Sequence, residues 1–565
     1  MNKAAITQTL HHLQITPDAI QDEQVAEAFR RVLQLVEALS EENTRLQKEI
    51  QKLRDEINLL KGEQAKPEIA ASKKNQQEDS SSEKERKRPK PRSERKTKAK
   101  KAKIHIDRSE VCKVNREILP EDAEFKGYQE VIVQDILIST ATVQYKKEVY
   151  YSPSRHKTYR GALPVGVEGE FGSGVKSLVY TLKHVANMPE PKIGEFFDNV
   201  GISISGATIS RILTHNNTLF HQDKIEIVQA GLSSTVYQQI DDTGGSVNGE
   251  NHYVHILCNP YYTAYFTLPH KNRVGVLDLL QGTIAGPSRH YYFTEEAFAL
   301  LDTFRVSQKV IGQIRRETVC NPLLNDGQMQ YLLGRVFPDP EQGKILRVRI
   351  MEAGAIAAYH HQTDYPVIPV RLSDDAPQFK HLTREHGLCW VHDGRHYKKL
   401  HPVVPYHQGH LEAFLEQYWE YYRELLPYRA HPTQEQAEFL SAEFDQVFST
   451  QTGDASLDER IAKSKAKKSE LLFVLKYPQL PLHNNAAELG ARAQVRKRDV
   501  SLQTRTKEGT EAKDPFLTIV QTATKLRVRA YEYIHDRVNK TYSLPSLASL
   551  IRSKASLELG YHDSG

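Results

Sequence analysis

The chain has 565 residues, of which 39% are hydrophobic and 26% charged, and its formal net charge is +5. At about 150 residues per domain, this length predicts three or four folded units with a sizeable core. No apolar run is long enough to span a membrane, and polar side chains interrupt the start of the chain, so we expect neither a membrane protein nor a secreted one. The 4 cysteines are scattered without a C-x-x-C pair, which excludes a disulfide framework and indicates the reducing cytoplasm.

A heptad repeat fills the first predicted domain, residues 1–62. β-branched residues at a with leucine at d favour two parallel strands, and the single Asn43 at an a position fixes the register. We therefore predict a coiled-coil homodimer, with a helix packed on its own protein as the alternative. The seam residues are Phe29, Val32, Val36, Leu39, Asn43, Leu46, Ile50, Leu53, Ile57 and Leu60.

Two segments of different composition follow. Residues 63–104 include the basic run 84–103, which has almost nothing to bury and is predicted to be a disordered linker. This linker either contacts DNA phosphates through its cations or is a solvated tether. Residues 105–170 are predicted to form a small β-rich module, with strands at 130–137 and 141–145 and a loop at 150–164.

Residues 171–225 show helical periodicity. Helices at 192–199 and 205–213, joined by a turn that contains Gly201, have the size of a helix-turn-helix, with Ser205 as the N-cap of the second helix. Ser205, Thr208 and Arg211 would then face DNA. An ordinary helical hairpin is the alternative.

Acidic pairs follow two predicted strands in the next domain, residues 226–540. Asp241-Asp242 follow a strand at 235–240, and Asp374-Asp375 follow one at 367–372. Further strands at 252–257 and 263–268 and a helix at 274–280 lie between them. This order is typical of an α/β RNase-H-like core, although an acidic pair after a strand is also ordinary turn chemistry.

A third acid lies in the stretch 480–498, where Asn484 and Asn485 precede an alanine-rich helix. On that helix Asn485, Glu488 and Arg492 share one face, which suits a metal ion that holds a phosphate, or else a solvated ion pair. A further helix is predicted from 515 to 538. Residues 541–565 are predicted to be a C-terminal tail, with a possible short helix at 544–551.

These motifs resemble the DDE transposases of bacterial insertion sequences, most closely the insertion-sequence family sixty-six type. Three elements carry the resemblance from about Ile104 onward: Asp241-Asp242-Thr243; Asp374 with Cys389-Trp390-Val391-His392 and Arg395; and Asn484-Asn485-Ala486-Ala487-Glu488 with Arg492 and Arg496-Lys497. The long intervals between the acids require insertions into the core, which are predicted to be helical, for example at 411–425 and 457–475.

The resemblance implies a transposase that binds terminal inverted repeats and catalyses DNA cleavage and strand transfer. It implies Asp241, Asp374 and Glu488 as catalytic ligands of two Mg²⁺ ions, for which Mn²⁺ can substitute, while Asp242 and Asp375 stay open as one-residue alternatives. DNA contacts are expected at Arg395, Arg492, Arg496 and Lys497. A catalytically silent repressor derived from a transposase is the alternative function.

The expected partners are terminal-repeat DNA, target DNA, a second copy of the chain and accessory proteins of the same element, at the bacterial nucleoid. Zinc is not expected. The family commonly carries a zinc knuckle in the region 105–170, but here only Cys112 remains. Cys389 and His392 likewise lack a second ligand pair nearby in the sequence, so core packing of Trp390 and backbone contacts of Arg395 with DNA are expected there instead.

Overall fold

The structure is a computed structural model of the chain. It describes residues 10, 16–60, 106–115, 118–120, 123–136, 138–164, 169–215, 217–281, 289–339, 341–363 and 365–562. The basic run predicted as a linker lies outside these residues. Within them, no helix combines the length and apolar character that a membrane span requires.

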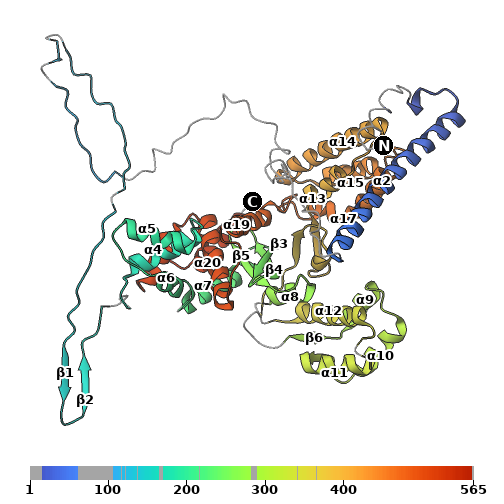
Figure 1. The fold of residues 1–565 in the computed structure, drawn as a ribbon. Helices are drawn as coiled ribbons and strands as arrows, with labels where there is room; N and C mark the ends of the chain where they lie inside the picture. Colours follow the sequence, from blue (N-terminus) through green and yellow to red (C-terminus); the bar gives the residue numbers. More distant parts are fainter. Residues whose placement is uncertain are drawn as a thin grey trace.

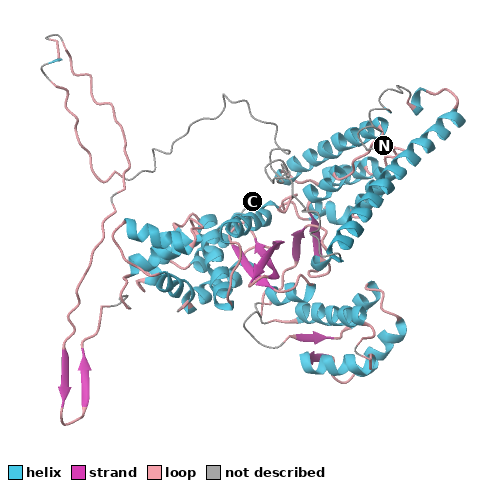
Figure 2. Ribbon diagram, in the orientation of Figure 1, coloured by secondary structure: helices cyan, strands magenta, loops and turns pink. Residues whose placement is uncertain are grey.

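A five-stranded mixed sheet lies at the centre of the fold (Figures 1 and 2). Its strands are β3 (Tyr237–Val247), β4 (Glu250–Cys258), β5 (Thr263–Leu268), β8 (Val370–Ser373) and β9 (Glu385–Leu388), in the spatial order β5-β4-β3-β8-β9. β3, β8 and β9 are parallel, and β4 is antiparallel to both β3 and β5. The predicted strands are confirmed with one difference. β3 continues past the acidic pair because it forms a hairpin with β4, so Asp241 and Asp242 lie within the strand.

Helices from residues 173–232 and from the C-terminal region pack together beside the sheet (Figure 1). The predicted helices of the region 171–225 are confirmed, and so is the helix predicted from 515, in two parts. The prediction of a C-terminal tail is wrong for its described residues, because a long helix there buries Leu547, Ala548 and Ile551 against the same core. These helices are α4 (Ser173–His184), α5 (Glu190–Asn199), α6 (Gly206–Thr214), α7 (Thr218–Leu232), α20 (Lys507–Leu526), α21 (Ala530–Val538) and α22 (Leu547–His562).

Both long intervals between the acids contain mainly helices, as predicted. The first holds α8 (Arg273–Leu280), β6 (His290–Tyr292), α9 (Glu295–Thr303), α10 (Gln308–Thr318), β7 (Leu323–Asn325), α11 (Asp326–Val336) and α12 (Lys344–His361). The second holds η6 (Pro377–Phe379), α13 (Trp390–Lys398), α14 (Pro405–Ala430), α15 (Gln434–Val447), α16 (Ala455–Lys465), α17 (Lys468–Leu471) and α18 (Phe473–Lys476), followed by α19 (Asn485–Ser501). Trp390 is fully buried in an aromatic core of the second insert, which confirms its predicted packing role.

A short 3₁₀ turn, η1 (Pro17–Ala19), precedes the long helix α2 (Glu23–Leu60), which contains the heptad repeat and lies along the second insert (Figure 1). Its first half packs on its own chain, where buried Leu33 contacts Val403 and Val404. Val36, a predicted dimer residue, belongs to this intramolecular contact. The predicted seam is therefore divided. Phe29 and Val36 pack on the same chain, whereas Val32 and the seam leucines and isoleucines from Leu39 onward are exposed.

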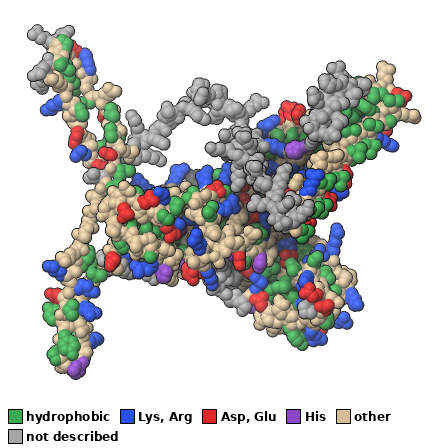
Figure 3. All heavy atoms as spheres, viewed as in Figure 1, with side chains coloured by type: hydrophobic (Ala, Val, Ile, Leu, Met, Phe, Trp, Pro, Cys, Tyr) green, Lys and Arg blue, Asp and Glu red, His purple; other side chains and the backbone are tan. Residues whose placement is uncertain are grey.

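The region 106–164 differs most from expectation. Its described residues contain no strand at 130–137 or 141–145, and a hairpin of β1 (Val149–Ser152) and β2 (Lys157–Arg160) occupies the segment predicted as loop. Alternating apolar residues predict a strand only where a partner strand lies beside them, and here none does. Exposed hydrophobic side chains therefore line this projecting arm, at the left of Figure 3.

Candidate active site

The sheet register brings the first two predicted acids together. Parallel pairing of β3 with β8 sets Gln239 opposite Leu372. Asp241 and Asp374 each lie two residues further along, so the same register leads to a facing pair of carboxylates. A sequence can place each acid near a strand, but the pairing of two distant strands is what makes them neighbours.

Burial and mutual repulsion act on this pair. Burial raises the pKa of Asp241 to about 7, and the charge of Asp374 contributes to the rise. Burial also raises the pKa of Asp374, which His392 partly opposes. Two buried carboxylates that repel one another form a site whose charge favours a divalent cation.

The second acid of each pair is engaged elsewhere. Asp242 pairs with the Lys271 ammonium at 2.6 Å and accepts a hydrogen bond from Gln378 at 2.7 Å. Asp375 forms ion pairs with Lys380, at 3.0 Å, and with Lys467. Burial alone would raise the pKa of Asp375, but hydrogen bonds from these two lysines outweigh burial and lower it. Asp242 and Asp375 are therefore paired with lysines, which distinguishes them from Asp241 and Asp374. The sequence alone could not make this distinction.

The third acid, Glu488, lies in the first turn of α19 and is 7% exposed. Fully buried Asn484 anchors this turn, because its Nδ2 donates to the carbonyl of Ile240 at 2.9 Å, directly before Asp241. Asn484 occupies the predicted N-cap position, yet its side chain makes no capping bond. Sequence reasoning missed this anchoring role, and the doubled asparagine was its only signal.

Positive groups surround the Glu488 carboxylate. His392 Nε2 lies 3.6 Å from Oε1, while Arg395 and Arg492 lie 3.5 and 3.7 Å from Oε2. Burial alone would lower the pKa of His392, but Cys389 and Glu488 outweigh burial and raise it to about 9. The charge of His392 also acts on Asp241 and Asp374, so this imidazole interacts with all three acids.

The predicted DNA contacts have different outcomes. Arg211 and Arg496 are exposed. Arg395 and Arg492 lie instead beside Glu488. The prediction that Lys497 contacts DNA is wrong, because this side chain is 5% exposed and its ammonium lies 2.7 Å from the Nδ1 of His184. Burial lowers the pKa of Lys497 well below its ordinary value, so it is no free cation for DNA.

The N-cap prediction on α6 is confirmed. Ser205 accepts a hydrogen bond from the Thr208 backbone N–H at 3.1 Å, and the two hydroxyls lie 2.9 Å apart. These hydroxyls therefore bond to each other at the start of α6, while Arg211 extends from the same helix. Arg211 is the freest of the three predicted contacts.

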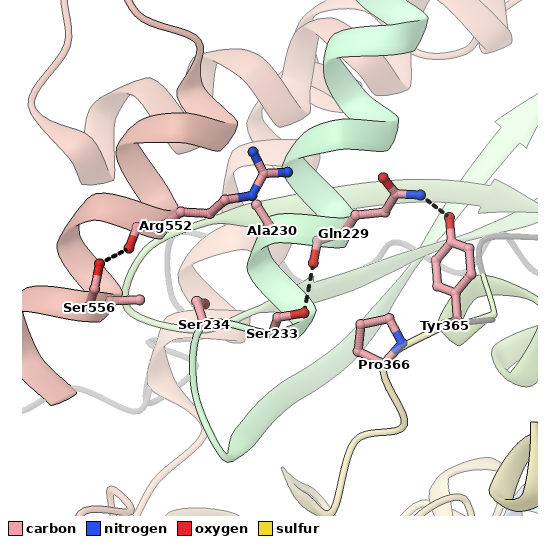
Figure 4. Close-up of a pocket in the computed structure, with 9 residues that line it drawn as sticks. Gln229, Ala230, Ser233, Ser234, Tyr365, Pro366, Arg552 and Ser556 are labelled. Atoms are coloured by element: carbon pink, nitrogen blue, oxygen red, sulfur yellow. Dashed lines mark hydrogen bonds between the residues drawn. The ribbon is translucent and has the colours of Figure 1, made fainter. Parts of the chain in front are cut away.

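A surface pocket lies away from these acids (Figure 4). Gln229 of α7, Ser233 directly after that helix, Tyr365 before β8, and Arg552 of α22 contribute to its lining. Tyr365 accepts a hydrogen bond from Gln229 at 3.2 Å. None of the three predicted acids lines this pocket, so it is not the candidate site.

Comparisons with known proteins identify relatives of the chain. Residues 367–512, which include Asp374 and Glu488, match the family described as Transposase IS66 family. The chain is also 31% identical over 330 residues to the Uncharacterized protein y4jO of Sinorhizobium fredii (strain NBRC 101917 / NGR234), a match that covers 58% of this chain and 100% of that protein. No solved structure matches the chain. The chain belongs to the IS66 family of transposases.

Proposed function

We propose that this transposase binds the terminal inverted repeats of its insertion sequence and catalyses metal-dependent DNA cleavage and strand transfer. The observation that carries the proposal is the meeting of three acids from distant parts of the chain. The β3–β8 register ends two residues before Asp241 and Asp374 and so leads these two acids to the same end of the sheet, and α19 brings Glu488 to the same His392.

The sheet supports an RNase-H-like core. Three antiparallel strands followed by two parallel ones, in the order β5-β4-β3-β8-β9, form the sheet of that fold. α19 packs on β3 and β4. One acid then lies on the first strand, one follows the fourth and one lies on a helix against the sheet, which is the arrangement that metal-dependent nucleotidyl transfer uses.

The residues present fit magnesium. Asp241 and Asp374 supply hard oxygen ligands in a buried site, where a bound cation would offset the repulsion between their charges. Glu488 supplies a third carboxylate. When bound, a pair of Mg²⁺ ions would activate the attacking oxygen and stabilise the leaving oxygen of an in-line displacement. Mn²⁺ can substitute, because N and O sites bind it more tightly than Mg²⁺ in general.

Other side chains would hold the DNA. Arg395 and Arg492 extend guanidinium groups beside Glu488, where a phosphate can receive paired hydrogen bonds. Arg496 is exposed on the same helix. Further away, Arg211 on α6 is exposed in the predicted helix-turn-helix, where it would contact the terminal repeat.

Substitution of each acid by its amide tests this proposal. Asp241→Asn, Asp374→Asn and Glu488→Gln keep side-chain shape but remove the charge that holds a divalent ion. A loss of several kcal/mol of metal stabilisation predicts a fall in strand-transfer rate of about 100-fold or more. The assay is strand transfer from a pre-cut end with Mg²⁺, beside a gel shift on the same DNA, which should show retained binding.

Asp242→Asn and Asp375→Asn are the matched controls. Each lies one residue from a proposed ligand, but its carboxylate is paired with lysine. We expect both to lose much less activity than their neighbours. Normal strand transfer by Asp241→Asn or Glu488→Gln would refute the assignment. A wild-type protein that binds the repeat but never transfers strands would instead indicate the repressor.

A further inference from the structure

A second group of metal-ligating side chains lies beside the acid pair. Cys389 Sγ, a ring nitrogen of His392 and a carboxylate oxygen of Glu488 all lie within 4.8 Å of one another. In the part of the chain that the structure describes, this is the one group of three such ligands at this spacing. The sequence did not predict a metal at Cys389 and His392, because no second ligand pair accompanies them. The third ligand, Glu488, comes from a distant helix.

Two chain segments are held together at this cluster. Cys389 is the N-cap of α13, and His392 lies in the first turn of that helix. The backbone N–H of Trp390 donates to the carbonyl of Leu482 at 3.0 Å, which ties the start of α13 to the segment before α19. Glu488 follows one turn into α19. The cluster is therefore built by buried backbone contacts and not by mobile surface side chains.

The surroundings of the sulfur suit a thiolate ligand. Cys389 is 1% exposed, and the backbone N–H of Asn484 donates to its Sγ at 3.2 Å. A hydrogen bond donated to sulfur stabilises the anionic form, and that form is the metal ligand. The same Asn484 anchors the turn that carries Glu488, so one residue orients two of the three ligands.

The distance between the other two ligands also suits an ion. His392 Nε2 lies 3.6 Å from Glu488 Oε1, which is longer than a hydrogen bond. Ligand bonds of about 2.0 to 2.3 Å at tetrahedral angles set neighbouring ligand atoms roughly 3.3 to 3.6 Å apart. Oε2 of the same carboxylate faces Arg395 and Arg492, so the oxygen that faces the cluster is the one nearer His392.

We infer that Cys389, His392 and Glu488 bind a zinc-class transition-metal ion, with a fourth position open to water or a DNA oxygen. Thiolate and imidazole ligands select Zn²⁺ and similar ions, whereas Mg²⁺ takes oxygen ligands. Three protein ligands with one open position are typical of zinc sites that contact substrate. This site shares Glu488 with the proposed magnesium site, but its existence does not depend on catalysis by Asp241 and Asp374.

Cobalt binding without DNA tests the inference. Cys112 and Cys320 are exposed and are first replaced by serine, so that surface thiols do not contribute. In this full-length background, titration with Co²⁺ should produce a thiolate-to-cobalt charge-transfer band that saturates at one ion per chain. Zn²⁺ should displace the cobalt, and zinc should remain at one ion per chain after gel filtration.

Variants then assign the ligands. Cys389→Ser should abolish the band. His392→Gln should weaken zinc binding more than the loss of a residue that only orients a ligand would, and that loss costs about 10- to 100-fold. Glu488→Gln should weaken zinc binding but keep the sulfur band. Cys258→Ser, at the other buried cysteine, is the control and should bind like the background. Circular dichroism checks that each variant is folded.

The outcomes separate this site from the proposed function. Absence of a stoichiometric cobalt band in the folded background protein, or a band that survives Cys389→Ser, would overturn the zinc-class site. Either result would leave the strand-transfer assays of Asp241→Asn and Asp374→Asn as an independent test of the magnesium chemistry. Normal cobalt binding with no strand transfer by the wild type would count against the proposed function alone.

Discussion

Asn484 connects the three motifs of the candidate site. Its side chain binds the carbonyl before Asp241, its backbone N–H binds Cys389, and its carbonyl accepts from the backbone N–H of Glu488 at 3.2 Å. A fully buried amide can make such bonds only if the segments around it are fixed. The side chain and backbone of this one residue thus link the segments that carry the first and third acids.

We predict that Asn484→Ala destabilises the protein by about 1–3 kcal/mol, because it leaves the buried carbonyl of Ile240 without its partner. Strand transfer should also fall at temperatures where the variant stays folded, since Glu488 loses its anchor. Denaturant unfolding and the strand-transfer assay measure the two effects. Asn485→Ala, one residue along on the partly exposed start of α19, is the control and should show neither loss.

Asp241 should make stability depend on pH. Its folded pKa, about 7, lies above the ordinary value of 3.8, because burial and Asp374 disfavour the charged form. From about pH 4 to about pH 7 the folded state therefore holds more protons than the unfolded state, and stability falls as pH rises. One pKa unit corresponds to about 1.4 kcal/mol, so the loss is a few kcal/mol.

Without divalent metal, Asp241→Asn should therefore be more stable than the wild type above this window and lack this decline. Mg²⁺ should restore stability to the wild type and change the variant much less, because it binds the charged carboxylates. Denaturant unfolding in chelator, with and without Mg²⁺, measures both effects. Equal pH profiles for the two proteins would contradict this account of the acid pair.

Among the elements, α19 depends on close approach to the sheet. A Cβ at Gly490 would lie 2.8 Å from Ile256 Cγ2 and 3.2 Å from Thr263 Cγ2, and Tyr265 donates to the Gly490 carbonyl at 3.0 Å. α19 can therefore lie this near β4 and β5 only because residue 490 has no side chain. The distance of this helix from the sheet decides where Glu488 lies.

We predict that Gly490→Ala costs about 1–3 kcal/mol through overpacking and reduces strand transfer by moving Glu488. Gly409→Ala in α14 is the matched control, because a Cβ there meets no atom within 4 Å. That control should be neutral or stabilising, since alanine favours a helix by up to about 1 kcal/mol over glycine. Thermal unfolding and strand transfer of both variants check the contrast.

Elements with strong local patterns were predictable from sequence, and tertiary pairings were not. Alternation located the central strands, but the extension of β3 past Asp241 depends on its hairpin with β4. Lys497 was expected to contact DNA, and this was wrong. Its burial against His184 depends on where α4 packs, which the residues next to Lys497 in the sequence do not show. Alternation at 130–137 failed for the converse reason, since no partner strand lies beside the residues of that segment that the structure describes.

The site shows the same limit. Each acid was predicted to be a ligand in its own motif, but the meeting of Glu488 with Cys389 and His392 joins two segments that no local pattern connects. The ion pair between Asp242 and Lys271, which distinguishes Asp242 from Asp241, is likewise a tertiary contact that no local pattern shows.

At the scale of the whole molecule, α2 has two different surfaces. Near its start, the Glu37 carboxylate accepts hydrogen bonds from the backbone N–H groups of Val403, at 2.8 Å, and Val404, at 2.7 Å. It thereby caps the start of α14, where amides have no partner within the helix. Removing all of α2 would therefore damage the catalytic part of the chain as well as any dimer contact.

The second half of α2 is where we predict self-association. Leu39, Leu46, Ile50, Leu53 and Ile57 are 46% to 69% exposed along one side of the helix. These residues continue the a and d positions that include Asn43, so the exposed side has the pattern of a coiled-coil seam.

Paired Leu46→Lys and Leu53→Lys substitutions should therefore convert a homodimer into a monomer of 64.5 kDa, because each dimer would bury four cations in its seam. The intramolecular contacts of Glu37 lie outside the altered positions, so the folded core should keep its thermal stability. Glu41→Lys, at an exposed position of the same helix outside the seam, is the control and should remain dimeric. Light scattering gives the masses, and binding of paired terminal repeats in a gel shift should weaken only for the seam variant. A dimer that survives both leucine substitutions would mean that this side of α2 serves another contact.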